Sequence, residues 1–166
     1  WLHSALTVIG IISVLDGVVV DGAKVLDLGS GGGYMTTILA KMVGPTGKVL
    51  AIDRDAEKLE QAKQTISQYY PHLLPNIEFR QGDVFGLHAG GPFDAIHVGG
   101  AVQEVPQEWL SLVKPGGSLI AATPEIEPTL NETQFMLRHF HVLKEGGVAP
   151  INMMYVNYEE LEEPKL

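Results

Sequence analysis

The sequence contains no cysteine, which excludes disulfide bonds and thiolate metal ligands and fits a reducing compartment. We therefore expect a cytoplasmic location. Basic residues are also scarce, because 11 lysines and arginines stand against 20 aspartates and glutamates, giving a formal net charge of −9. That balance disfavours binding driven by contacts to a nucleic-acid backbone, so no nucleic-acid partner is expected.

No apolar run is long enough to span a membrane or to read as a signal peptide. Residues 6–20 are strongly apolar, but Gly10, Asp16 and Gly17 interrupt them and no basic region precedes them. They predict a buried helix over residues 2–15, whose apolar surface is a candidate contact for a protein partner. The 166 residues, 45% of them hydrophobic, predict one domain, 1–166. Because the chain begins with Trp1, we expect it to be part of something longer.

A glycine-rich bend follows the first predicted strand, residues 24–28. Glycines at 29, 31, 32 and 33 let the backbone turn sharply and come into contact with a ligand. A helix predicted over 34–43 then points its first, unpaired amides at that ligand. The dinucleotide fingerprint needs a glycine where Tyr34 stands, so the spacing favours a nucleoside cofactor other than NAD.

Strands and helices alternate along most of the chain. Further strands are predicted over residues 48–52, 76–81, 93–98 and 118–123, and a short helix over 106–113. Asp55 is expected to cap a helix whose apolar face carries Leu59, Ala62, Ile66 and Tyr69. Residues 134–144 and 149–155 predict a hairpin, and the acidic residues 159–163 a solvated end. The fold class expected is α/β, a Rossmann-like doubly wound, mostly parallel seven-stranded sheet with a C-terminal antiparallel hairpin.

Three aspartates lie at or beside the carboxyl ends of predicted strands, where open α/β sheets bind their ligands. Asp53 ends the second strand, where it can accept hydrogen bonds from both hydroxyls of a ribose. Asp83 follows the third strand, where it can hold an adenine amine, and Asp27 lies in the first strand beside the glycines. The competing interpretation is that all three are helix caps and loop carboxylates.

Three motifs downstream resemble one family in their spacing: Asp-Ala-Ile-His-Val-Gly-Gly-Ala at 94–101, Val-Pro-Gln at 105–107 and Leu-Val-Lys-Pro-Gly-Gly-Ser-Leu-Ile at 112–120. The chain resembles the protein L-isoaspartate O-methyltransferases over about residues 22–158. The resemblance implies S-adenosylmethionine as cofactor, with its methionine end at the glycine bend, its ribose on Asp53 and its adenine on Asp83. It also implies that His97 and Val98 border the reaction site. The implied cofactor-binding residues are Asp27, Gly29, Ser30, Gly31, Gly33, Tyr34, Asp53, Asp83 and Val84.

The start of the chain departs from that family, whose members carry a Thr-Ile-Ser-x-Pro segment that shapes the substrate pocket. Here His3 stands in the place of the functional serine and Ser4 is one position away, so these two are the candidate catalytic positions. Val84 replaces the family's usual glycine. Because a carboxylate acceptor is already ionised at pH 7, positioning is the main task of such an enzyme, and a lost clamp can abolish turnover.

Three functions therefore stay open. The first is methylation of a carboxylate in isoaspartyl peptides or proteins, which is a protein-repair activity. The second is a catalytically inactive methyltransferase-like structural or interaction domain, and the third is a methyltransferase with another acceptor. His97 is either a substrate contact or a satisfied core histidine. No metal is expected, because the histidines other than His3 and His97 form no metal-ligand pattern with neighbouring carboxylates. These are His72, His88, His139 and His141.

Overall fold

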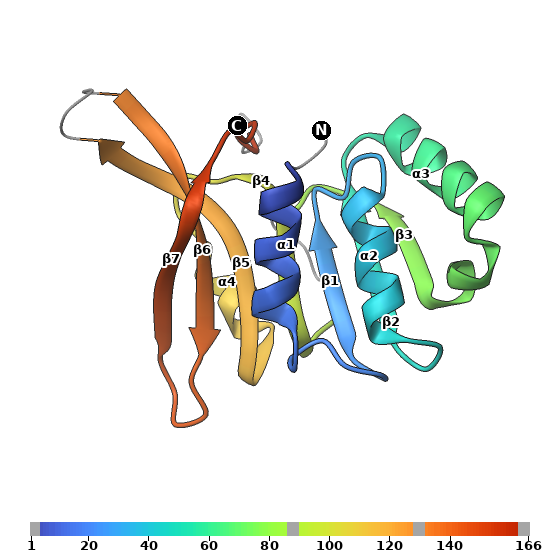
Figure 1. Cartoon of the computed structure of the whole chain (residues 1–166), viewed down its shortest axis with the longest axis horizontal. Coiled ribbons are helices and arrows are strands. Elements are labelled where there is room, and N and C mark those ends of the chain that lie inside the picture. Colours follow the sequence, from blue (N-terminus) through green and yellow to red (C-terminus); the bar gives the residue numbers. More distant parts are fainter. Residues whose placement is uncertain (1–3, 86–89, 128–131, 163–166) are drawn as a thin grey trace.

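The computed structural model describes residues 4–85, 90–127 and 132–162. They form a seven-stranded sheet in the order β3-β2-β1-β4-β5-β6-β7 (Figure 1). The strands from β1 to β5 pair in parallel, whereas β6 and β7 pair antiparallel with their neighbours. The expected mostly parallel sheet with a C-terminal hairpin is confirmed. The strands are β1 (Lys24–Leu28), β2 (Lys48–Asp53), β3 (Ile77–Gln81), β4 (Phe93–Ala101), β5 (Val113–Glu127), β6 (Glu132–Val142) and β7 (Val148–Val156).

Helices lie on both faces of the sheet. In Figure 1 the helices α1, α2 and α3 cover the near face, and α4 lies behind the sheet. The bounds are α1 (Ala5–Leu15), α2 (Tyr34–Val43), α3 (Ala56–Tyr69) and α4 (Gln107–Ser111), with a 3-10 helix η1 (Pro71–Asn76) after α3. None of the described helices is long and apolar enough to cross a membrane.

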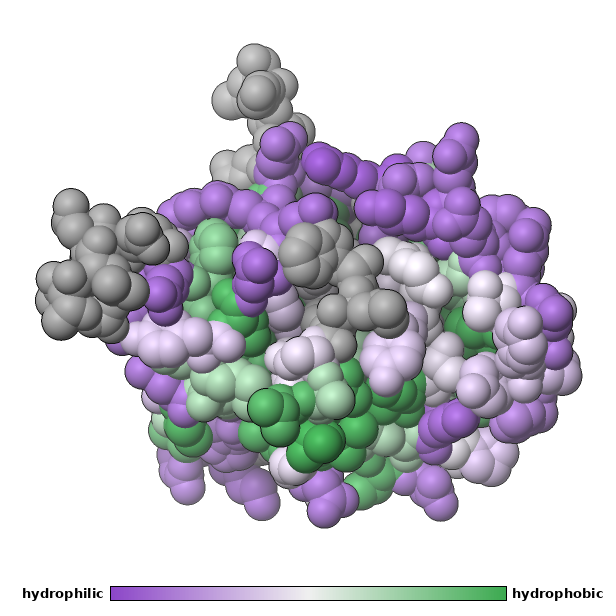
Figure 2. Space-filling view, turned by 45° about the horizontal axis from the view of Figure 1, so that its top comes forward, coloured by the Kyte–Doolittle hydropathy of each residue, from purple (hydrophilic) through white to green (hydrophobic). Residues whose placement is uncertain are grey.

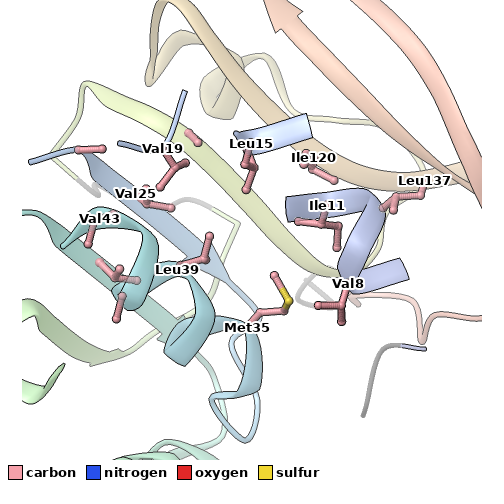
Figure 3. Close-up of a cluster of buried hydrophobic side chains, with 14 of the residues drawn as sticks. Val8, Ile11, Leu15, Val19, Val25, Met35, Leu39, Val43, Ile120 and Leu137 are labelled. Carbon is pink, nitrogen blue, oxygen red and sulfur yellow. The ribbon is translucent and has the colours of Figure 1, made fainter. Parts of the chain in front are cut away.

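The hydrophobic core has one layer on each side of the sheet, because successive strand residues point to opposite faces. On the near face, Ile11 of α1 and Leu39 of α2 pack over Val25 of β1 (Figure 3). On the far face, Leu26 of β1 belongs to a cluster that includes Trp109 of α4. Both faces of β1 are therefore covered, which explains why it is an almost continuous apolar run.

Local signals place the helices that border the site. Asp55 accepts hydrogen bonds from the amides of Glu57 and Lys58, so its predicted role as the N-cap of α3 is confirmed. Leu59, Ala62 and Ile66 of this helix are buried, whereas Tyr69, expected on the same face, is not. Tyr69 is exposed because α3 ends there and Leu73 of η1 is buried in the same core cluster as Ile66.

The largest difference from the predicted bounds is at β5, which extends well beyond residues 118–123 in both directions. The added length comes from pairing with two neighbours. On one side β5 pairs with β4 from Val113 onward, and on the other it pairs antiparallel with β6 as far as Glu127 and Glu132. The Lys-Pro-Gly-Gly stretch at residues 114–117, a composition typical of turns, falls inside this strand, beside a register shift in the β4 ladder. Of the helix predicted over residues 2–15, the structure describes 5–15 as α1.

Candidate functional site

The carboxyl ends of the parallel strands border a cavity of about 660 Å³, here called the sheet-end cavity. This volume falls within the range of about 300–1,000 Å³ that small-molecule and cofactor sites occupy. Its described lining comes from the starts of α1 and α2, the ends of β1, β2 and β4, the loop after β3, the neighbouring α3, and the end of β7 with the chain that follows it. The lining residues are Ser4, Thr7, Asp27, Gly29, Ser30, Gly31, Gly32, Tyr34, Met35, Asp53, Arg54, Lys58, Gln61, Asp83, Val84, His97, Gly99, Gly100 and every residue from 155 to 162.

The glycine bend between β1 and α2 forms the floor of this cavity. The amides of Gly29 and Ser30 both donate to the carbonyl of Ile52, at 2.8 and 3.1 Å, which fixes the bend to β2. Gly33 has a φ of 83°, and a Cβ there would lie 2.7 Å from the Cβ of Ala62 in α3. A side chain at this position would therefore be strained and would push α3 away.

The middle of the bend is open toward the cavity. A Cβ built on Gly31 or Gly32 meets no described atom within 4 Å. The hydroxyl of Ser30 is buried and has no hydrogen-bond partner among the described residues. Because buried hydroxyls in proteins are normally paired, the Ser30 hydroxyl and the empty space over the glycines indicate that a polar ligand belongs here.

Asp53 connects the end of β2 to the bend. Its Oδ2 accepts from the Gly31 amide at 2.8 Å, and its Oδ1 accepts from the Asp55 amide at 2.9 Å. An ionised carboxylate has about four acceptor positions, so two protein donors leave room for two more. The side chain therefore keeps the capacity to accept from a pair of neighbouring hydroxyls.

Asp83 and Val84 line the far side of the same cavity, in the loop after β3. The Asp83 carboxylate accepts from the Phe85 amide at 2.9 Å, which stabilises the local turn, and the Asp83 residue is exposed. Val84 is buried, and its carbonyl accepts from the indole nitrogen of Trp109 at 3.1 Å. The loop position is thus fixed to α4 on the far face of the sheet.

A buried polar network lies beneath the bend. Asp27 is fully buried and accepts from the hydroxyl of Thr36 at 2.6 Å and from Nδ1 of His97 at 2.8 Å. Asp27 and His97 are also register partners in the β1 and β4 pair. His97 thus has a satisfied Nδ1, as expected of a core histidine, and it also lines the cavity, while its contact with a substrate stays a prediction.

The remaining predicted residues divide between the cavity and the core. Tyr34 lines the cavity and is about half exposed. Val98 is fully buried in the core cluster of the α4 face and is not among the described lining residues. Ser4 lines the cavity, but its hydroxyl caps α1 by accepting from the Thr7 amide at 3.2 Å. His3 lies outside the described residues.

The chain after β7 is the part of the site that the sequence did not reveal. The Ala101 amide donates to the Glu159 carbonyl at 2.8 Å, and the Leu161 amide donates to the Ala101 carbonyl at 2.7 Å. Glu159 and Glu160 have exposed side chains, as expected of a solvated end, but their backbone is paired with β4. The sequence also did not predict the hydrogen bond from Thr36 to Asp27, because this contact depends on how α2 packs on β1 and has no local sequence motif.

Burial shifts the pKa of two further titratable groups, one at the cavity and one away from it. Burial raises the pKa of Tyr158, which is at the cavity. Burial and the neighbouring His141 lower the pKa of His139, whose Nε2 is hydrogen-bonded to the Ser118 hydroxyl at 2.8 Å. Within the described parts of the chain, no group of three or more histidines, aspartates and glutamates is arranged to hold a metal ion.

Comparison with known proteins shows that the sequence matches the model of one protein family. The model of the family described as protein-L-isoaspartate(D-aspartate) O-methyltransferase matches residues 3–160. A protein-L-isoaspartate O-methyltransferase of Caenorhabditis elegans is 33% identical over 111 residues, which cover 65% of this chain and 49% of that protein. Protein-L-isoaspartate O-methyltransferase 2 of Arabidopsis thaliana is 35% identical over 108 residues, or 60% of this chain and 33% of that protein. The chain thus spans half or less of the length of these relatives.

The fold is shared with solved structures. A Plasmodium falciparum structure described as a protein-L-isoaspartate O-methyltransferase, in complex with S-adenosyl-L-homocysteine, superposes with a TM-score of 0.79. The likeness covers 91% of this chain and 71% of that chain, at 23% sequence identity. At this identity the comparison shows a common fold, and the chemistry has to be argued from the residues of this chain.

Proposed function

The chain belongs to the protein-L-isoaspartate(D-aspartate) O-methyltransferase family, and from that membership and the sheet-end cavity we propose that it is an S-adenosylmethionine-dependent methyltransferase. Its proposed acceptor is a carboxylate of isoaspartyl peptides or proteins. One observation carries the proposal: the open glycine bend is tied through the Gly31 amide to Asp53, a carboxylate that retains free acceptor positions. A cytoplasmic location is proposed with it, supported by the absence of cysteine.

The cofactor fits the residues that line the bend. The Ser30 hydroxyl and the first amides of α2 supply donors for the charged methionine end, and the space over Gly31 and Gly32 admits it. Asp53 would hold the ribose hydroxyls, and Asp83 with Val84 would hold the adenine at the far side of the cavity. The proposed cofactor-binding set is the one expected from the sequence: Asp27, Gly29, Ser30, Gly31, Gly33, Tyr34, Asp53, Asp83 and Val84.

Asp27 is proposed to support cofactor binding without contacting the cofactor itself. Both of its oxygens already accept bonds from protein groups, so its proposed role is to fix Thr36 of α2 and His97 of β4 around the bend. Because a buried carboxylate without partners is costly, this network holds the bend in one conformation. The ligand would then meet a floor that needs little rearrangement on binding.

When bound, S-adenosylmethionine supplies a methyl group on a positively charged sulfur. An isoaspartyl carboxylate is ionised at neutral pH and needs no general base, so the chain's task is to align it and to exclude water. Alignment of two reactants can lower the activation barrier by roughly 7–11 kcal/mol. The rate would therefore depend mainly on how the cavity walls hold the two reactants. Ser4 and His97 are proposed to border the acceptor, since both line the cavity near the ends of α1 and β4.

A second candidate function, an interaction domain without catalysis, is favoured by the start of the chain. The Ser4 hydroxyl is engaged as a helix cap, and Leu6 and Ile9 on the outer face of α1 are 74% and 59% exposed. Figure 2 shows hydrophobic residues gathered in the lower middle of the view. A protein partner that contacts α1 would remove this apolar surface from water. Replacing Leu6 and Ile9 with serine should then weaken self-association or partner binding and leave ligand binding unchanged.

Two measurements test the first proposal separately from the second. Isothermal titration of the folded protein with S-adenosylhomocysteine should show one saturable site, and a complete absence of binding would overturn the cofactor assignment. Transfer of labelled methyl from S-adenosylmethionine to an isoaspartyl peptide, with the matching aspartyl peptide as control, tests the acceptor. Binding without transfer to either peptide overturns the isoaspartyl acceptor and leaves the interaction domain and a methyltransferase with another acceptor, which a panel of other acceptors then separates.

A further inference from the structure

The segment 157–162 is built into the sheet at the carboxyl end of β4. Glu160 forms a parallel bridge with Ala101, and its side chain accepts from Nε2 of Gln103 at 2.7 Å. In Figure 1 the chain returns from the upper end of β7 toward the upper end of β4, where the glycine bend also lies. The segment therefore forms a wall of the sheet-end cavity in the described structure.

Leu161 is the apolar side chain of this wall. A Cβ on Gly100 would lie 2.7 Å from Leu161 Cδ2, and a Cβ on Gly29 would lie 3.4 Å from the same atom. The leucine thus fills the space that these two glycines leave, one in the bend and the other in β4. It also packs against the core cluster on the α4 face, so its position is fixed from two sides.

The corner that Leu161 closes is where the bend and the end of β4 meet. On the proposed function, the methyl donor lies over the bend and the acceptor lies beside β4, so the two reactants meet at this corner. An apolar side chain here excludes water and limits the positions that either reactant can take. A truncated side chain would leave the corner open and wet.

From this geometry we propose that Leu161 is a positioning residue, which closes the corner between the glycine bend and β4 and holds the bound cofactor against the bend. The proposal rests on the proposed function, because it needs a ligand over Gly29. It assigns no proton transfer or covalent step to the residue. Its expected signature is a change in binding and turnover without a matching change in folding.

The test compares Leu161→Ala, Leu161→Met and Leu110→Ala with the wild-type protein. Leu110 is partly buried in the same core cluster but does not line the cavity, so it controls for lost packing. We expect Leu161→Ala to raise the dissociation constant for S-adenosylhomocysteine about tenfold and to lower kcat with the isoaspartyl peptide, where each factor of ten corresponds to 1.4 kcal/mol. Leu161→Met should restore most of both, and Leu110→Ala should leave both unchanged.

The outcomes distinguish a failure of the positioning role of Leu161 from a failure of the proposed cofactor binding. If the wild-type protein does not bind S-adenosylhomocysteine, both fail together. If the wild type binds and Leu161→Ala binds equally or more tightly, the positioning role alone is overturned. Backbone hydrogen exchange at Ala101 supplies a readout in every variant, because its amide is bonded to Glu159. Fast exchange there with unchanged affinity would show that the wall can open without affecting the ligand, which also overturns the proposal.

Discussion

Asp27 of β1 and Thr36 of α2 lie on opposite sides of the glycine bend and are joined by a 2.6 Å hydrogen bond that is fully buried. The bond closes the loop that contains the bend, and it leaves Asp27 one further oxygen for His97. The shape of the bend thus depends on groups that a ligand need not touch.

Replacing Thr36 with valine should destabilise the fold. The substitution keeps the volume but removes the donor, so a buried carboxylate loses a partner at a cost of about 1–3 kcal/mol. Denaturant unfolding measures the loss. Thr37→Val is the matched control in the same helix, since the Thr37 hydroxyl bonds only the Gly33 carbonyl and is partly exposed. A cost for Thr36→Val no larger than that of the control would contradict the assignment.

Two neighbouring glycines should differ in how much stability they lose when each is replaced with alanine. Gly33→Ala adopts a left-handed φ and presses on Ala62, so unfolding should become easier by about 1–3 kcal/mol. Gly32→Ala meets no described atom, so the free energy of unfolding should change by less than about 0.5 kcal/mol.

The same pair also tests where the ligand lies. Because Gly32 lines the sheet-end cavity and an added methyl group there would occupy open space, Gly32→Ala should weaken S-adenosylhomocysteine binding by at least about tenfold, or 1.4 kcal/mol. Titration calorimetry at a temperature where both proteins are folded gives the comparison. Unchanged affinity in Gly32→Ala would place the ligand away from the bend.

Asp53 should be essential for cofactor affinity. Hydrogen bonds to a charged group contribute about 1.5–3 kcal/mol, so Asp53→Ala should weaken binding by roughly ten- to a hundredfold. Asp55→Asn is the control, because asparagine also caps helices and the substitution keeps the neighbouring α3 in place. Equal affinities in the two variants would remove Asp53 from the site.

The sequence predicted those parts of the fold that local residues determine. The helix expected over residues 34–43 and α2 have the same bounds, since a glycine bend precedes it and a glycine ends it. The strand before the bend also matches β1, because its residues are mostly apolar and the strand is buried on both faces. Asp53 and Asp83 were expected at one edge of the sheet, and both line the cavity found there.

Contacts between distant residues could not be predicted in this way. The bond between Asp27 and His97 joins residues 70 positions apart, and only the register of β1 with β4 brings them together. Residues 159–163 read as a solvated end because their side chains are mostly acidic. Their pairing with β4 uses backbone groups alone, which the types of the side chains do not predict. The position of Leu161 could therefore be seen only in the structure.

The stability of the protein should fall on the acid side through His139. Burial and His141 hold the pKa of His139 below its ordinary value of 6.5, so the unfolded chain takes up the proton more readily than the folded one. This contribution is therefore complete above the ordinary value and is lost as the pH falls through it.

Unfolding measured between about pH 8 and pH 5 tests this dependence. His139→Gln should lose less stability over this interval than the wild-type protein. The exposed His72 provides the control, and His72→Gln should keep the wild-type slope. Parallel profiles for all three proteins would exclude His139 as the cause.

The strand order has a consequence for how the chain folds. Strands β5, β6 and β7 are consecutive and antiparallel, so their contacts join segments close in sequence, whereas β1 and β4 pair although the whole of β2 and β3 lies between them in the chain. Pairing between distant segments is the slow part of folding. The antiparallel half of the sheet can thus form before its centre is joined. We therefore expect the cavity, which has its floor after β1 and its wall in the chain after β7, to form late in folding.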